Sequence, residues 1–167
     1  MPPKQKPGSS KQDYSTPQVF VDAVKKLLEI KEFKFDFAAD AGNAKAPRWW
    51  SKTNDSLSHY AGYWAEQIEH GWGWLNPPFA HIGPWAEKCM EVKRHEGQVA
   101  LLVPAAVGSN WFRDYVDGHA QVLFLNGRLA FMPDKPKWLY PKDCILCLYS
   151  PVVAAQYEVW KWRHHED

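Results

Sequence analysis

The uninterrupted apolar run from Val99 to Val103 is the feature that most limits how this chain can fold. A strand with apolar residues on both of its faces must be covered on both sides, as the strands of parallel sheets are. Pro104 ends the run, because proline has no N–H to donate to a neighbouring strand. Similar patterns predict other strands at Phe33–Phe37, Trp49–Lys52, Gln121–Leu125 and Cys144–Tyr149, and an apolar strand just before Asn76.

Helical segments alternate with these strands. The first is predicted to open at Thr16–Pro17, where Thr16 can cap the helix and Pro17 suits its first position. An apolar stripe at helical spacing follows, formed by Phe20, Val24, Leu27 and Leu28. Further helical segments are predicted at Leu57–His70, at Gly83–His95 and after Ser109, which can cap a turn containing Trp111 and Phe112. This alternation predicts an α/β fold with a mostly parallel sheet flanked by helices.

The chain is long enough for one domain with its own core, and no change in composition marks a second domain. We therefore expect a flexible basic tail at residues 1–13, one domain at residues 14–160 and a C-terminal tail at residues 161–167. Lysines are the only charged side chains before Asp13. The first tail could therefore touch a phosphate backbone, although a solvated tail is the simpler interpretation.

Cysteine content, hydropathy and net charge limit the compartments and the partners that fit this chain. Three cysteines without a signal peptide favour a reducing, cytoplasmic compartment. Cys144 and Cys147 should point to opposite faces of their strand, so no metal site is expected. No apolar stretch approaches the roughly 18 residues that span a bilayer, so no membrane partner is expected. The net charge of +1 does not by itself indicate a polyanionic partner.

The tetrapeptide Asn76-Pro77-Pro78-Phe79 follows a predicted strand and should lie at the carboxyl edge of the sheet, where open α/β sheets bind ligands. Its residues suit the methylation of an exocyclic amine. The side-chain carbonyl of Asn76 and the backbone carbonyl of Pro77 can accept both amine hydrogens, which favours the tetrahedral geometry that frees the lone pair. The prolines keep the turn rigid, and Phe79 can stack on an extruded base. A proline turn that only ends a strand is the simpler alternative.

Together with other segments in the same order, this tetrapeptide resembles the phage and prophage DNA N6-adenine methyltransferases, the Dam-like family. The segments are Thr16-Pro17 with Phe20; Phe35 to Ala39 with Asn43 to Lys45; Asp55 to Leu57; Asn76 to Phe79 with Trp85 and Lys88; Leu102 to Ala105 with Trp111 and Phe112; and Gly127 to Leu129 with Phe131. The resemblance runs from Thr16 to about Ser150. It implies a single, compressed Rossmann-like class I domain that methylates adenine N6 in double-stranded DNA, with S-adenosylmethionine as methyl donor. For a phage-encoded enzyme it also implies the host cytoplasm.

The resemblance also implies roles for residues outside the tetrapeptide. The expected cofactor-binding residues are Thr16, Pro17, Asp36, Ala38, Gly42, Asn43, Asp55, Leu57 and Asn76. Asp36 matches an acid that contacts the methionine amino group, and Asp55 matches an acid near the cofactor adenine. A turn cap and a solvated loop acid are the simpler interpretations of these two. The expected DNA contacts are Arg48, Lys52, Arg113 and Arg128, with recognition by the loops after Phe79 and between Arg128 and Pro141.

The chain departs from larger methyltransferases at two points. Its first loop has one glycine, Gly42, where the larger enzymes have a glycine-rich turn. The short span from Asp36 to Asp55 also implies that one strand–helix unit, with its ribose-binding acid, is missing or compressed. Three other functions fit part of the pattern: methylation of RNA adenine, methylation of a protein glutamine amide, and non-catalytic DNA binding by a protein that keeps the fold.

Overall fold

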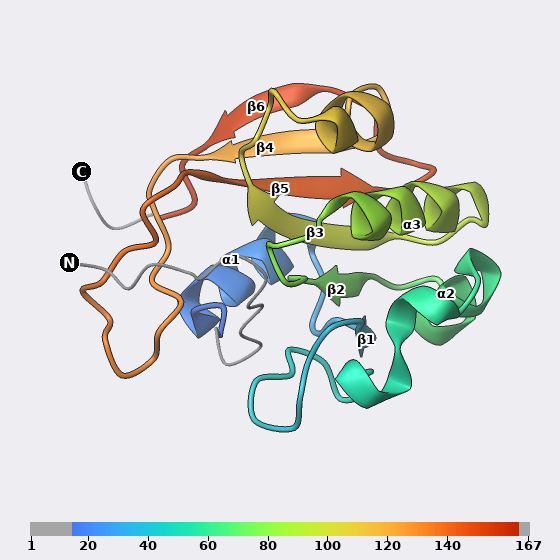
Figure 1. Cartoon of the computed structure of the whole chain (residues 1–167), viewed down its shortest axis with the longest axis horizontal. Helices are drawn as coiled ribbons and strands as arrows, with labels where there is room; N and C mark the ends of the chain where they lie inside the picture. The colour runs from blue at the N-terminus through green and yellow to red at the C-terminus, as the bar shows by residue number, and fades with distance from the viewer. Residues whose placement is uncertain (1–14, 164–167) are drawn as a thin grey trace.

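A computed structural model of the chain describes residues 15–163, so the tail expected at residues 1–13 lies outside the described part. A six-stranded sheet lies between two helical layers (Figure 1). Its strands are β1 (Phe35–Asp36), β2 (Gly73–Leu75), β3 (Val99–Pro104), β4 (Gln121–Leu125), β5 (Cys144–Tyr149) and β6 (Tyr157–Trp160). The helices are α1 (Gln18–Leu28), α2 (Ala61–Ile68) and α3 (Gly83–Arg94), with the 3-10 turns η1 (Lys52–Asn54) and η2 (Ser56–Ser58) and the π-helical turn η3 (Phe112–Val116).

The sheet is mixed, with the strand order β1-β2-β3-β5-β4-β6. The pairs β1–β2, β2–β3 and β4–β6 are parallel, whereas β5 is antiparallel to both of its neighbours. Five strands therefore run in one direction, and β5 runs in the other. The expectation of a mostly parallel sheet needs this correction, because the apolar run Cys144–Tyr149 fits a buried central strand of either direction.

Different helices cover the two faces of the sheet, and β3 shows the division. Val99, Leu101 and Val103 face the core to which α2, α3 and η3 contribute, whereas the residues between them face the core of α1. Cys144 and Cys147 divide between the same two cores, as the period of a strand predicts. Within residues 15–163, no helix combines the length and the apolar character that crossing a bilayer requires.

Most predicted elements are present: β4 and β5 have the predicted bounds and β3 is one residue longer, whereas other elements are shorter. The strand predicted at Phe33–Phe37 forms only the two residues of β1. The helical segment predicted at Leu57–His70 contains the last two residues of η2 and all of α2. The helix predicted at Gly83–His95 forms as α3 and ends one residue earlier. Hydrophobic periodicity therefore gave accurate bounds for the buried central strands and placed the ends of the strand at Phe33–Phe37 and of the helices too far out.

The segment Trp49–Lys52 does not form the predicted strand. Only Trp49 pairs with the sheet, through an isolated parallel bridge to Asp36. The side-chain Oδ1 of Asn54 accepts the backbone N–H of Ser51 at 2.8 Å and the Ser51 hydroxyl at 3.0 Å. These local bonds compete with a strand ladder and turn the chain into η1.

The predicted caps differ in outcome. The Oγ of Ser109 accepts the backbone N–H of Phe112 at 3.3 Å, which confirms the cap predicted there. Thr16 does not cap α1, because Pro17 occupies the N-cap position and, within residues 15–163, no side-chain hydrogen bond caps the helix. The Thr16 hydroxyl is bonded elsewhere, at the site described below.

The C-terminal part adds a strand that hydrophobic periodicity did not predict. β6 is an edge strand in which Tyr157 and Val159 are exposed, so no buried alternation marks it in the sequence. Beyond it, Trp162 is only 3% exposed and packs edge-on against Phe20 of α1, with ring centroids 5.1 Å apart. Trp162 lies within the range 161–167 that we expected to be a tail, so the packed body continues at least to this residue.

Candidate functional site

The carboxyl ends of β1 and β2 lie side by side, because these strands are parallel neighbours. They bring Asp36, with the loop after it, to the same edge as Asn76–Phe79, which follows β2 and is called the elbow below. The segment before α1 reaches this edge too, where the N–H of Ser15 donates to the carbonyl oxygen of Phe131 at 2.9 Å. The edge thus gathers segments from four distant parts of the sequence.

Asn76 has one end of its amide bonded and the other end without a partner. Its Nδ2 donates to the Oγ1 of Thr16 at 2.9 Å. Its Oδ1 is buried and accepts no hydrogen bond within the described part of the chain. A buried acceptor without a donor costs about 1–3 kcal/mol. Such an atom at the ligand-binding edge of a sheet indicates a site for a hydrogen-bond donor that the chain itself does not provide.

Phe79 is half-buried in an aromatic cluster with Phe131 and Tyr140. Its ring lies edge-to-face with both, at centroid distances of 5.9 Å and 5.6 Å. Both partners belong to the long connection between β4 and β5, and the backbone N–H of Tyr140 donates to the carbonyl of Leu129 at 2.7 Å. This connection therefore holds the aromatic end of the elbow in place.

Asp36 organises the loop after β1. Its two carboxylate oxygens accept the backbone N–H groups of Ala38 at 3.2 Å and Lys45 at 3.0 Å. Burial raises the pKa of Asp36 to about 7, an effect that the N–H bonds from Lys45 and Ala38 partly offset. Burial also lowers the pKa of Lys45, against the attraction of Asp36 and Asp22. Since Asp36 is only 2% exposed, it acts on its surroundings mainly through the loop that it folds.

This raised pKa makes protein stability depend on pH. Between about pH 5 and about pH 7 the folded protein keeps the Asp36 proton, whereas the unfolded chain, with a pKa near 3.8 for this group, has lost it. The contribution of this proton to the free energy of unfolding is fully present below pH 3.8 and is lost as the pH rises through 7. The free energy of unfolding falls across this range with a slope of at most about 1.4 kcal/mol per pH unit. Asp36→Asn should remove this slope. Urea unfolding of both proteins across the window measures the difference, and equal slopes would contradict the assignment.

The loop from Asp40 to Asn43 bonds to itself. The Oδ1 of Asp40 accepts the N–H groups of Gly42 at 2.8 Å and Asn43 at 3.1 Å, and the Oδ1 of Asn43 accepts the N–H of Asp40 at 2.8 Å. The backbone N–H groups of Gly42 and Asn43, two predicted cofactor-binding residues, therefore already donate to Asp40 within the turn. Gly42 lies close to Asp40, since a Cβ there would approach Asp40 Oδ1 to 3.3 Å.

A cavity of about 170 Å³ joins the loop after β1 to the elbow. It is lined by Phe37, Ala38, Ser51, Lys52, Asp55, Ser56, Pro78 and Trp85. Asp55 has a left-handed backbone (φ 49°), which aspartate adopts more readily than most residues, and this turn separates η1 from η2. Of the predicted cofactor-binding residues, Ala38 and Asp55 line this cavity, whereas Leu57 is half-buried in η2 and does not line it.

A larger cavity of about 770 Å³ lies at the opposite edge of the sheet. It is lined by the end of α2 and by Gly71 and Gly97, which precede β2 and β3. None of the predicted site residues lines it. The smaller cavity is therefore the better candidate for the functional site despite its volume, because Pro78 of the elbow lines it.

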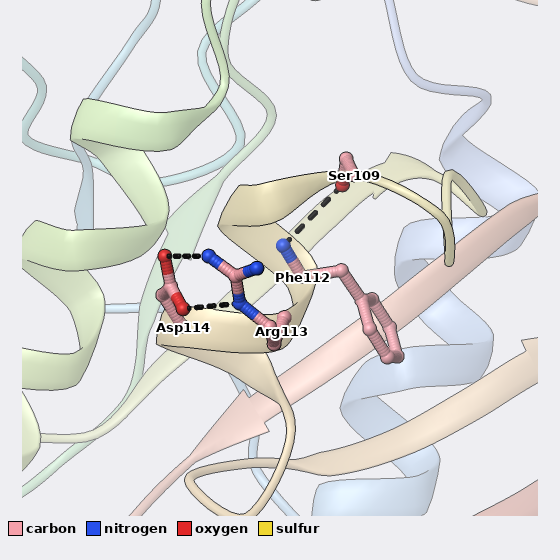
Figure 2. Close-up of polar contacts among 4 residues, drawn as sticks. All are labelled: Ser109, Phe112, Arg113 and Asp114. Carbon is pink, nitrogen blue, oxygen red and sulfur yellow. Dashed lines mark hydrogen bonds and ion pairs between the residues drawn. The ribbon is translucent and has the colours of Figure 1, made fainter.

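The four predicted DNA-contacting residues are dispersed. Arg48 donates to Gln67 at 2.6 Å, and Arg128 pairs with Asp143 at 3.1 Å. Figure 2 shows the guanidinium of Arg113 turned onto its neighbour Asp114, with contacts of 2.7 Å and 3.1 Å. Lys52 is exposed and lines the smaller cavity. Among the described residues, no group of three or more His, Cys, Asp or Glu side chains is arranged to hold a metal ion.

Sequence reasoning missed the partners of the predicted residues. Lys45 and Trp85 were part of the resemblance, but nothing in their spacing indicated that Lys45 would close the Asp36 loop or that Trp85 would line the cavity. The Thr16–Asn76 bond joins residues 60 positions apart, and no local pattern reports such a contact. The Asp40-x-Gly-Asn turn was detectable, because short polar side chains commonly bond the backbone two or three residues on.

Two comparisons with known proteins bear on this site. The sequence model of a family described as DNA N-6-adenine-methyltransferase (Dam) matches residues 4–143, which include the elbow and every residue that lines the smaller cavity. A protein of Escherichia phage T1 named DNA N-6-adenine-methyltransferase is 24% identical over 99 residues. The aligned part is 59% of this chain and 39% of the phage protein, so it spans less than half of that relative.

Proposed function

Because the chain belongs to the DNA N-6-adenine-methyltransferase (Dam) family, we propose that it transfers a methyl group from S-adenosylmethionine to the N6 of adenine in double-stranded DNA. The base must leave the helix first, since a stacked amine cannot be approached in line. The observation that most supports this proposal is the buried Oδ1 of Asn76, an acceptor without a donor at the edge where β1 and β2 end.

The elbow offers what adenine N6 needs in order to react. Its lone pair is delocalised into the ring, so the nitrogen is a poor nucleophile. Hydrogen bonds from its two N–H groups to Asn76 Oδ1 and to the Pro77 carbonyl draw it toward tetrahedral geometry and stabilise the positive charge that develops on it. Pro77 and Pro78 fix the turn, so little reorganisation is needed during the reaction.

The smaller cavity fits part of the cofactor. S-adenosylmethionine supplies an electrophilic methyl group on a sulfonium centre. The 170 Å³ cavity is smaller than the roughly 300–1,000 Å³ of pockets that enclose whole ligands of this size. We therefore assign it to a flat portion such as the adenine ring, with Trp85 as an apolar wall and the Asp55 carboxylate as an acceptor. Pro17 and the Asp36-folded loop are assigned to the rest of the cofactor.

We assign the fold to a compressed Rossmann-like class I domain. Its support is the series β1-α2-β2-α3-β3, in which three parallel neighbours are connected by crossover helices, as in one half of a doubly wound sheet. β1 is an edge strand, and η1 and η2 lie on the way from it to α2. This agrees with the loss of a strand–helix unit between Asp36 and Asp55.

Among the predicted DNA contacts, Lys52 and Arg113 provide a matched pair. Lys52→Ala should lower DNA affinity and reduce the slope of log affinity against log salt by about 0.9, the value for one lost phosphate contact. Arg113→Ala should change both quantities less, because its charge is already paired with Asp114. Fluorescence anisotropy of a labelled duplex at several salt concentrations measures both, and equal slopes for Lys52→Ala and the wild type would remove Lys52 from the DNA surface.

The experiment that tests the function is methyl transfer with labelled S-adenosylmethionine. Duplex DNA, RNA of the same sequence and a glutamine peptide are offered separately, and the products are digested and analysed by mass spectrometry. We expect N6-methyladenine from the duplex alone. Label in the RNA or the peptide would support those alternatives, and duplex binding without transfer would indicate a non-catalytic protein. Single-molecule sequencing of DNA from expressing cells would then give the recognition sequence.

A further inference from the structure

We propose that Thr16 is a positioning residue that holds the Asn76 side chain in the orientation required for methyl transfer. This inference rests on the proposed function and assigns a new role to a residue that was expected to cap the first helix and to border the cofactor. Its starting point is the bond from Asn76 Nδ2 to Thr16 Oγ1, 2.9 Å long. Thr16 is 3% exposed, so water competes little for this bond.

The fold fixes the position of the Thr16 hydroxyl from both sides. On one side, the N–H of Ser15 donates to the Phe131 carbonyl at 2.9 Å. On the other side, α1 is docked on the sheet through Phe20, whose ring contacts that of Trp74 in β2 at a centroid distance of 6.5 Å. Since Pro17 is the N-cap of α1 and no side chain in the described part of the chain caps it, the Thr16 hydroxyl does not serve the helix.

In the structure, the bond to Thr16 holds the Asn76 amide with its acceptor end free. An amide has a donor end and an acceptor end of nearly equal shape, and rotation about its last bond exchanges them. Here the donor end is taken by Thr16, which leaves the acceptor Oδ1 for the amine of the base. Without the hydroxyl, the amide of Asn76 has no hydrogen-bond partner among residues 15–163. It can then rotate and present N–H groups, which cannot accept from an amine.

Two variants of Thr16 separate this role from a packing or cofactor-binding role. Thr16→Val keeps the shape of the side chain and removes the hydroxyl, whereas Thr16→Ser keeps the hydroxyl and removes the methyl group. A packing role requires the methyl group, and the positioning role requires the hydroxyl. If Thr16 positions Asn76, Thr16→Val should be impaired and Thr16→Ser should not. If Thr16 only packs, Thr16→Ser should be impaired and Thr16→Val should not.

The first measurement does not depend on activity. The side-chain NH₂ signals of Asn76 in a ¹⁵N-labelled protein are identified by their loss in Asn76→Ala. We expect these signals to shift in Thr16→Val and to stay close to wild type in Thr16→Ser. Unchanged Asn76 signals in Thr16→Val would overturn the proposal, because the bond would then not hold the amide.

The second measurement is steady-state kinetics with duplex DNA and S-adenosylmethionine. We expect kcat of Thr16→Val to fall about 5- to 10-fold, as the loss of one neutral hydrogen bond predicts, with the Kd for S-adenosylmethionine within twofold of wild type. Thr16→Ser should restore kcat. A rise in Kd without a fall in kcat would overturn the positioning role in favour of a cofactor contact. A wild type that transfers no methyl to DNA would refute the proposed function instead, and the NMR result alone would decide whether Thr16 holds Asn76.

Discussion

Asn76→Ala is expected to lower the rate of methyl transfer at least about 10²–10³-fold, the loss seen when one preorganised hydrogen-bonding group is removed from a reacting centre. The change deletes the acceptor Oδ1 and leaves the Pro77 carbonyl as the remaining acceptor for the amine. Single-turnover transfer of labelled methyl to duplex DNA measures the rate directly, even when it is very slow.

The same variant should fold with nearly normal stability. It loses one neutral bond to Thr16, which contributes about 1 kcal/mol, but it also removes a buried oxygen without a donor, which costs a similar amount. Asn126→Ala is a matched control, because Asn126 follows β4 at the same edge and is exposed. Asn76→Ala with activity within tenfold of wild type, or a control with an equal loss, would refute the assigned role.

The elbow was the part of the site that the sequence could predict, because a local pattern determines it. An apolar strand followed by Asn76 and two prolines must turn at the sheet edge, and β2 ends at Leu75 as this requires. The long-range partners followed no such pattern. The Thr16 hydroxyl was expected to cap α1, a local role that its residue type suggests, but it bonds Asn76 instead. Tertiary contacts of this kind depend on how α1 docks, which no short window contains.

The same distinction explains the outcome for the fold. Runs buried on both faces, such as Val99–Val103, identified their strands, and the stripe of α1 identified the helix. The direction of β5 was not predictable, because a buried apolar run reads the same in a parallel and an antiparallel pair. β6 was not predicted, because its side chains are exposed at the edge of the sheet and leave no pattern of burial in the sequence. It pairs with β4 through backbone hydrogen bonds, which the side chains do not report.

Phe79→Ala is expected to lower the affinity for a flipped adenine by about 5- to 150-fold, as the loss of 1–3 kcal/mol of base stacking predicts. The ring lies at the end of the elbow, held edge-to-face by Phe131 and Tyr140. Since Phe79 does not line the cavity assigned to the cofactor, the Kd for S-adenosylmethionine should change less than twofold. Binding of a duplex with the target adenine unpaired, measured with and without the cofactor, gives both affinities.

Two further variants separate stacking from support of the aromatic cluster. Phe79→Leu keeps an apolar side chain against Phe131 and Tyr140 but lacks a π-face, whereas Phe79→Tyr keeps the ring. If Phe79 stacks on the base, Phe79→Tyr should bind the duplex nearly as well as wild type, and Phe79→Leu should bind almost as weakly as Phe79→Ala. If the ring only supports the connection between β4 and β5, Phe79→Leu should retain most of the affinity. An equal loss of cofactor and duplex binding in Phe79→Ala would also contradict the stacking role, because a collapsed edge, rather than a missing ring, would then explain both.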